Sequence, residues 1–165
     1  MTKIIKVFMV IFYALNLIHN SMGKTPVRKC ANGLPEPLSV QVNSCSEMPC
    51  TLWRGFSTNM EIQFVSSKDA VRDINADVQM TTAGIGMSLG LSSERKNVCN
   101  NLMFGAYCPM YAEEDATYHL VLDIADHQPE VPVKIEVSIK DSSDDTVFAC
   151  FVLDGKIRRR NAPLM

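Results

Sequence analysis

Hydrophobic and polar residues alternate along much of the chain after residue 24, with a period of two residues. The segment 60–64 (MEIQF) is one example, and the segments 73–80, 118–124 and 133–139 repeat the pattern. Successive side chains of a β-strand point to opposite faces, so each segment has one apolar face and one hydrated face. The alternation predicts antiparallel sheets that bury one face and expose the other.

Turn-forming residues separate these segments. Glycine, proline, aspartate and serine cluster at 33–37 (GLPEP), 126–129 (DHQP) and 141–145 (DSSDD), and such clusters favour turns. No segment after the N-terminal region shows a strong helical period. About seven short strands with regular turns are typical of an all-β sandwich. The acidic cluster Asp141, Asp144 and Asp145 lacks the glycine and the distal glutamate of a calcium-binding loop, so we expect a solvated hairpin turn there.

The first 23 residues have the features of a secretory signal peptide. Lys3 and Lys6 precede an apolar run at 7–18, and small residues precede a plausible cleavage site after Gly23. A membrane anchor is the alternative, but the run is shorter than the roughly 20 residues that span a bilayer. We therefore expect a secreted, extracellular chain with one domain at 24–165.

The charge of the domain narrows the class of partner. Residues 1–23 contain two lysines and no acidic residue, so their removal takes the formal net charge from −2 to −4. A nucleic-acid-binding domain usually carries a basic surface. The mild acidity therefore argues against nucleic acid as a partner.

The domain contains six cysteines, and these are Cys30, Cys45, Cys50, Cys99, Cys108 and Cys150. An even number of cysteines in a secreted chain favours disulfides. The spacings match neither the short paired gaps of most zinc sites nor the Cys-x-x-Cys redox motif. Many pairings are possible, and the sequence alone does not choose among them. Loop length favours Cys45 with Cys50 and Cys99 with Cys108, which leaves Cys30 for Cys150.

The segment 84–99 differs from the other alternating segments. Ile85, Met87, Leu89 and Leu91 alternate there with glycine and serine. This composition predicts a weakly held edge strand. Ordinary core packing and the lining of a ligand cavity both fit this alternation.

The domain offers little chemistry for catalysis. Its two histidines are His119, on the hydrated face of a predicted strand, and His127, beside Asp126 in a loop that contains a proline. A hydrolytic triad requires a nucleophile, a base and an acid that converge in space, and no nucleophile-elbow motif is present. We expect no enzyme activity, no metal and no cofactor.

Several motifs follow one another in a recognisable order. They are the segment 49–55 (PCTLWRG), the Cys-Pro pair at 108–109, Tyr118 and the segment 132–137 (PVKIEV), set among the six cysteines. This order closely resembles the Niemann–Pick type C2-like branch of the ML lipid-recognition domain family, over nearly the whole domain. The resemblance implies an immunoglobulin-like β-sandwich of two antiparallel sheets with a lipid cavity between them. It also implies the disulfides Cys30–Cys150, Cys45–Cys50 and Cys99–Cys108, and we expect Cys45–Cys50 to hold the start of the strand that contains 60–64.

The chain departs from the sterol carriers of that family at several positions. Glycine and serine replace prolines in the pocket segment around Leu89, and Val131 stands where an aromatic residue guards the mouth. Asp154-Gly155 is expected to interrupt the last strand. A less aromatic mouth favours a flexible acyl chain over a rigid sterol.

The resemblance and the alternation together nominate the residues that line a lipid pocket. These are Phe64, Val78, Met80, Met87, Leu89, Leu91, Leu122, Ile124, Val131, Val133 and Ile135. The implied function is a secreted or endolysosomal carrier of a sterol, a fatty acid or a similar hydrophobic ligand. The carrier would act as a monomer and exchange its ligand with an acceptor membrane or a receptor. The alternative is a secreted, lipid-dependent recognition protein that needs a protein partner.

Overall fold

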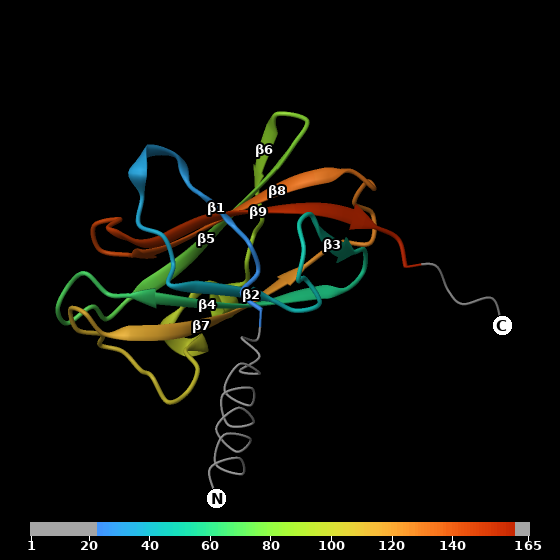
Figure 1. Cartoon of the computed structure of the whole chain (residues 1–165). Helices are drawn as coiled ribbons and strands as arrows, with labels where there is room; N and C mark the ends of the chain where they lie inside the picture. Colours follow the sequence, from blue (N-terminus) through green and yellow to red (C-terminus); the bar gives the residue numbers. More distant parts are fainter. Residues whose placement is uncertain (1–22, 161–165) are drawn as a thin grey trace, which may run out of the picture.

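The computed structural model describes residues 23–160, which form two β-sheets packed face to face (Figure 1). The larger sheet has the strand order β1-β9-β8-β5-β6, with β3 also paired to β9, and the smaller sheet has the order β2-β4-β7. In chain order the strands are β1 (Arg28–Lys29), β2 (Ser39–Val42), β3 (Cys50–Trp53), β4 (Ser57–Val65), β5 (Ile74–Thr82), β6 (Ile85–Ser88), β7 (Asp115–Asp123), β8 (Pro132–Asp141) and β9 (Val147–Arg158). All pairings are antiparallel except that of β3 with β9.

The period-two alternation places the core between the two sheets, as predicted. In β4 the side chains of Met60, Ile62 and Phe64 are fully buried, whereas the intervening residues are partly exposed. The strands β5, β7 and β8 show the same alternation of buried and more exposed residues. The apolar faces of both sheets therefore meet in one hydrophobic cluster, and the predicted all-β sandwich is confirmed.

The three disulfides join the cysteines in the expected pairs. Cys30–Cys150 spans 120 residues of sequence, Cys45–Cys50 spans five and Cys99–Cys108 spans nine. The long bond attaches the start of the domain to β9 on the outer side of the larger sheet, where Val152 packs beside it. No cysteine among residues 23–160 is free.

The expectation for the strand that follows Cys45–Cys50 is wrong. Cys50 begins β3, which pairs with β9 in the larger sheet, and the chain then turns at 54–56 into β4 of the smaller sheet. The disulfide therefore holds the start of β3 and not the strand that contains 60–64. Four residues are too few for a sequence pattern to show which sheet they join.

The last strand is continuous, in contrast to the expected interruption at Asp154-Gly155. Strand β9 runs through both residues and pairs there with β3 and β8. Gly155 is required by the close approach of its neighbours, because an added Cβ would lie 2.8 Å from Cδ1 of Leu52 and 3.2 Å from Cγ2 of Val133. The glycine therefore permits close packing between β9 and its neighbours and does not end the strand.

The acidic turn between β8 and β9 is only partly solvated, which corrects a second expectation. Asp141 is 4% exposed and accepts hydrogen bonds from Lys68 Nζ and from the backbone and hydroxyl of Ser143. Lys68 also binds Asp144, which is exposed. Asp141 therefore ties the β8–β9 turn to the loop between β4 and β5.

Short helices occupy some of the connections, although the sequence indicated none. They are the 3₁₀ turns η1 (Ala31–Gly33) and η2 (Cys99–Asn101) and the single turn α2 (Ser93–Lys96). A four-residue helix is too short to show a period of 3.6, which explains the missed prediction. The sequence SSERK nevertheless contains a start signal, because the Ser92 hydroxyl accepts a hydrogen bond from the Arg95 backbone.

The expected signal peptide lies outside the described residues apart from Gly23. Among residues 23–160, no helix has the length and the apolar character that a membrane crossing requires.

Candidate functional site

Seven of the eleven nominated residues lie together between the sheets. Each is at most 4% exposed, and the seven come from or adjoin strands of both sheets: Phe64, Val78, Met80, Leu122, Ile124, Val133 and Ile135. At the far end of this core the Phe64 ring stacks on that of Phe148, with 6.4 Å between the ring centroids. The resemblance and the alternation together thus located an apolar layer to which both sheets contribute.

The other four nominated residues lie at the rim of this layer. Leu89, Leu91 and Val131 are half-buried and pack against the core. Met87 pairs with Met80 across β5 and β6, but its side chain is 41% exposed. The structure therefore does not bring Met87 into the core. Beyond it, Ile85 is 68% exposed in the hairpin that projects above the rest of the sheet (Figure 1).

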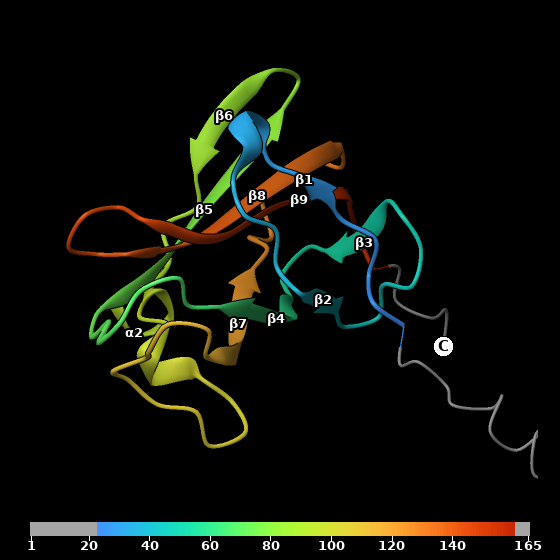
Figure 2. The same cartoon turned by 60° about the vertical axis from the view of Figure 1, so that its left-hand side comes forward.

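The two sheets are connected along one edge by the segment 89–103. At its start the Leu89 backbone N–H donates to Val78 O (2.8 Å), and further along the Val98 N–H donates to Ile74 O (2.9 Å). The segment then reaches the smaller sheet, where the Met103 N–H donates to Thr117 O (2.8 Å). Figure 2 shows α2 in this segment, beside the edge of the sandwich. The segment therefore covers the gap between β5 of one sheet and β7 of the other.

A pocket of about 450 Å³ opens at this covered edge. It is lined by Leu89, Gly90, Leu91, Ser92, Glu94, Arg95, Leu122 and Asp123. We call it the edge pocket. Its leucines include Leu122, which belongs to the core between the sheets. The pocket thus adjoins the apolar layer on one side and carries charged groups on the other.

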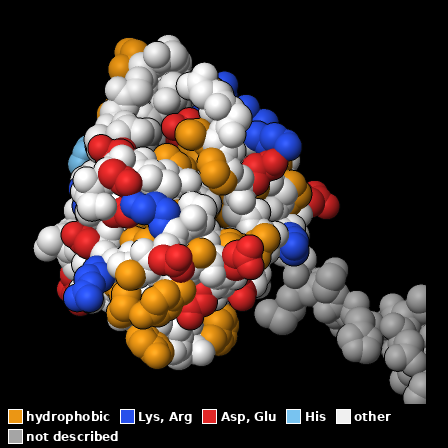
Figure 3. Space-filling view, turned by 90° about the vertical axis from the view of Figure 1, so that its left-hand side faces the viewer, with side chains coloured by type: hydrophobic (Ala, Val, Ile, Leu, Met, Phe, Trp, Pro, Cys, Tyr) orange, Lys and Arg blue, Asp and Glu red, His pale blue; other side chains and the backbone are white. Residues whose placement is uncertain are grey.

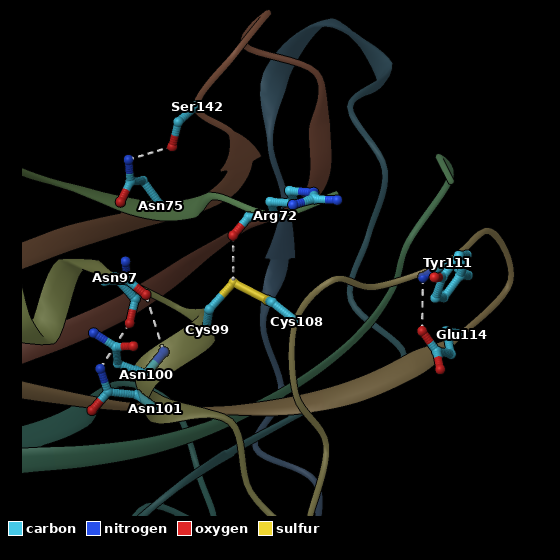
Figure 4. Close-up of a disulfide and its surroundings, with 10 residues drawn as sticks. All are labelled: Arg72, Asn75, Asn97, Cys99, Asn100, Asn101, Cys108, Tyr111, Glu114 and Ser142. Carbon is cyan, nitrogen blue, oxygen red and sulfur yellow. Dashed lines mark hydrogen bonds between the residues drawn. A yellow bond between two sulfur atoms is a disulfide. The ribbon is translucent and has the colours of Figure 1, made fainter. Parts of the chain in front are cut away.

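The backbone of α2 is firmly attached next to the edge pocket. The Tyr118 hydroxyl donates to Arg95 O (2.6 Å), and burial raises the pKa of Tyr118. The side-chain amide of Asn101 donates to Glu94 O and Asn97 O. Asn101 lies beside the Cys99–Cys108 disulfide, as Figure 4 shows. The position of Arg95 is therefore set by a disulfide-bonded loop and a buried tyrosine.

An ion pair crosses the edge pocket. Arg95 Nη1 lies 2.5 Å from Asp123 Oδ2, and the two side chains are 38% and 60% exposed. The Ser57 hydroxyl donates to Asp123 Oδ1 (2.6 Å). Two hydrogen bonds lower the pKa of Asp123. The one from Ser57 has the larger effect, and the one from Arg95 comes second. Sequence analysis missed these three residues, because the partners lie 28 and 66 positions from Asp123 in the chain.

A second pocket, of about 530 Å³, lies at the opposite end of the sandwich. Its apolar lining includes Leu38, Val65, Val147 and Phe148. The loop that leads to Ala112 and Glu113 of this lining carries Phe104 and Tyr107, which are 83% and 77% exposed. Figure 3 faces this end of the molecule and shows hydrophobic side chains among carboxylates. None of the residues that line this pocket was nominated from the sequence.

The two candidate histidines occupy separate places in the described part of the chain. His119 lies on β7 opposite Glu61, whereas His127 is exposed in the loop that follows β7. Glu136 lies near Cys30 and Cys150, but those sulfur atoms form a disulfide. A disulfide offers no thiolate to a metal.

The fold and its disulfides allow a comparison with known proteins. The sequence profile of the ML domain family matches residues 24–157. The chain belongs to the ML domain family. This ML domain is 23% identical to NPC intracellular cholesterol transporter 2 of Sus scrofa over 124 residues, which cover 73% of this chain and 77% of that protein.

A solved structure supports the same fold. The crystal structure of a Niemann-Pick type C2 protein from the Japanese carpenter ant superposes with a TM-score of 0.68. The match covers 81% of this chain and 99% of the ant protein, at 18% sequence identity. The expected architecture of an NPC2-like sandwich is therefore confirmed, and the similarity at this level of identity concerns the fold.

Proposed function

We propose that this ML domain binds a hydrophobic small molecule, a sterol or a fatty acid, and carries it through an extracellular or endolysosomal compartment. The observation that carries the proposal is the edge pocket, where Leu89, Leu91 and Leu122 connect the surface to the apolar layer between the sheets. The name of the porcine relative, a cholesterol transporter, agrees with this function. The three disulfides agree with a compartment outside the cytosol.

The mechanism is burial of apolar surface. Each methylene that leaves water for an apolar environment gains about 0.8 kcal/mol. Entry requires Leu89 and Leu91 to move outward, since both pack on the core at the edge of the sandwich. The preceding strand β6 is exposed along its whole length and pairs with β5 alone, so no second strand holds this end of the segment in place. The chain acts as a binding protein and catalyses no reaction.

The first experiment identifies the ligand in protein made by secretion, with residues 24–165 and all disulfides intact. Organic extraction and mass spectrometry identify any lipid that co-purifies, and a fluorescent sterol and a fluorescent fatty acid then compete with it. We expect one lipid at about one molecule per chain. Protein without lipid that binds neither probe would contradict a carrier and favour a recognition protein acting through its surface.

A substitution tests whether the edge pocket is the entrance. Leu89→Trp places a larger side chain where Leu89 packs on the core, so we expect affinity for the bound lipid to fall at least about tenfold. Phe104→Trp is the matched control, because Phe104 is 83% exposed and does not line the edge pocket. Circular dichroism checks that both variants fold. Equal affinity in folded Leu89→Trp and wild-type protein would refute this entrance.

A further inference from the structure

The edge pocket combines an apolar wall with a charged rim. Leu89, Leu91 and Leu122 form the wall, whereas Arg95 and Asp123 bind each other across the opening. A purely apolar ligand would gain nothing from the rim. A ligand with an apolar chain and one charged end would satisfy both parts of the pocket.

The Arg95 side chain is free to change partner, although its backbone is fixed. Tyr118 and the Ser92 cap hold the peptide groups of this residue. The Arg95 side chain is 38% exposed, and Asp123 is its one ion-pair partner among the described residues. Asp123 is 60% exposed and keeps its hydrogen bond from Ser57 when Arg95 leaves. An exchange of partners therefore leaves no charge buried without a partner.

We propose that Arg95 binds the carboxylate of a fatty acid whose chain lies along Leu89, Leu91 and Leu122, and that Asp123 occupies this position when no ligand is bound. The proposal rests on the proposed function and names its ligand class. A guanidinium forms two parallel hydrogen bonds with a carboxylate. The Asp123 carboxylate already makes one such contact, so the ligand's carboxylate replaces a group of the same chemistry and charge.

The charges of the rim favour a carboxylate over other polar ends. The hydroxyl of a sterol would replace a charged acceptor of the guanidinium by a neutral oxygen, so the attraction between opposite charges and the two parallel hydrogen bonds of a carboxylate would be lost. A phosphate would bring a second negative charge close to Glu94 and Asp123, which line the same pocket. A single negative charge is therefore the best match for one guanidinium in a pocket that two carboxylates also line.

Two ligands of equal chain length test this assignment. Titration calorimetry measures the affinity of the disulfide-bonded protein for dodecanoic acid and for dodecanol, which differ only in the polar end. Removal of a charge-assisted hydrogen bond weakens binding by about tenfold or more. We expect Arg95→Met to lower the affinity for dodecanoic acid by about that factor. The affinity for dodecanol should stay unchanged. Lys96→Met is the matched control, because Lys96 is exposed beside Arg95 and does not line the pocket.

The substitution Asp123→Asn gives an effect of opposite sign. Asparagine still accepts the hydrogen bond from Ser57 but no longer competes as an anion for Arg95. We expect dodecanoic acid to bind several-fold more tightly to Asp123→Asn than to the wild type, with dodecanol again unchanged.

The outcomes separate this inference from the function on which it rests. The role of Arg95 would be overturned if Arg95→Met lost the same affinity for the acid as for the alcohol. It would also be overturned if a folded Arg95→Met variant kept its affinity for the acid. Lipid binding itself would stand in both cases. Wild-type protein that binds neither ligand would overturn both the carrier function and this assignment.

Discussion

At the scale of single residues, Lys68 holds two carboxylates of the β8–β9 turn. Its ammonium lies 2.5 Å from Asp141 and 2.8 Å from Asp144. The hydrogen bonds from Lys68 lower the pKa of Asp141 and lower that of Asp144 to about 2. Because Asp141 is buried, its charge depends on this partner more than the exposed Asp144 does.

The lowered pKa values predict that acid weakens the fold. In the unfolded chain both carboxyls titrate near pH 4, so between about pH 5 and pH 2 the unfolded state binds more protons than the folded state. The free energy of unfolding therefore falls as the pH drops through this range. We expect Lys68→Met to lower the urea midpoint at neutral pH and to make its acid dependence shallower.

The matched control for Lys68 is Lys140→Met. Lys140 pairs with Asp145, whose side chain is 82% exposed, and such surface pairs contribute little to stability. Urea unfolding at several pH values compares the three proteins. An acid dependence in Lys68→Met as steep as that of the wild type would show that other groups cause it.

At the scale of secondary-structure elements, close packing at Gly155 joins β9 to both neighbouring strands. Gly155 pairs with Cys50 of β3 and with Val133 of β8. The fully buried Leu52 fills the space where a side chain of residue 155 would lie. Because β9 is hydrogen-bonded to a strand on each side at Gly155, its backbone is held in place and does not move away from an added Cβ.

We expect Gly155→Ala to destabilise the protein, because its Cβ would clash with Leu52. Overpacking of a core typically costs about 1–3 kcal/mol, measurable by urea unfolding. Gly86→Ala in β6 is the control. The nearest atom to its added Cβ would be Thr81 Oγ1, at 3.6 Å, which is an ordinary van der Waals contact. Gly86→Ala should be neutral or slightly stabilising. Equal stabilities for the two variants would mean that Leu52 moves aside without cost.

At the scale of the whole molecule, the disulfides restrict the unfolded chain to very different degrees. Cys30–Cys150 closes a loop of 120 residues, whereas Cys45–Cys50 closes one of five. In the chain-entropy account the long bond stabilises by about 5 kcal/mol and the short one by about 2 kcal/mol. The long bond also holds both ends of the domain on one sheet.

These values predict an order of stability for variants that lack one bond. Replacing both Cys30 and Cys150 by alanine should lower the free energy of unfolding by more than replacing Cys45 and Cys50. Chemical denaturation of the secreted variants measures both losses. A larger loss for the short bond would show that local structure at β3 outweighs restriction of the unfolded chain.

The sequence by itself determined the features that depend on local order. The period of two placed Met60, Ile62 and Phe64 on one buried face, because neighbouring side chains of a strand must point to opposite sides. Loop length and the family resemblance pointed to the three cysteine pairs that the structure contains. The family resemblance and the alternation nominated seven residues that meet between the sheets.

Only the tertiary structure decided features that join distant segments. It assigned β3 to the larger sheet through a pairing with Gly155 and its neighbours, more than 100 positions away. In the tertiary structure Lys68 forms a hydrogen bond with the buried Asp141, and Arg95 forms one with Asp123 at the edge of the sandwich. A hydrophobic pattern specifies which face of a strand avoids water, but it carries no information on which strand lies beside it or which charges meet at the rim.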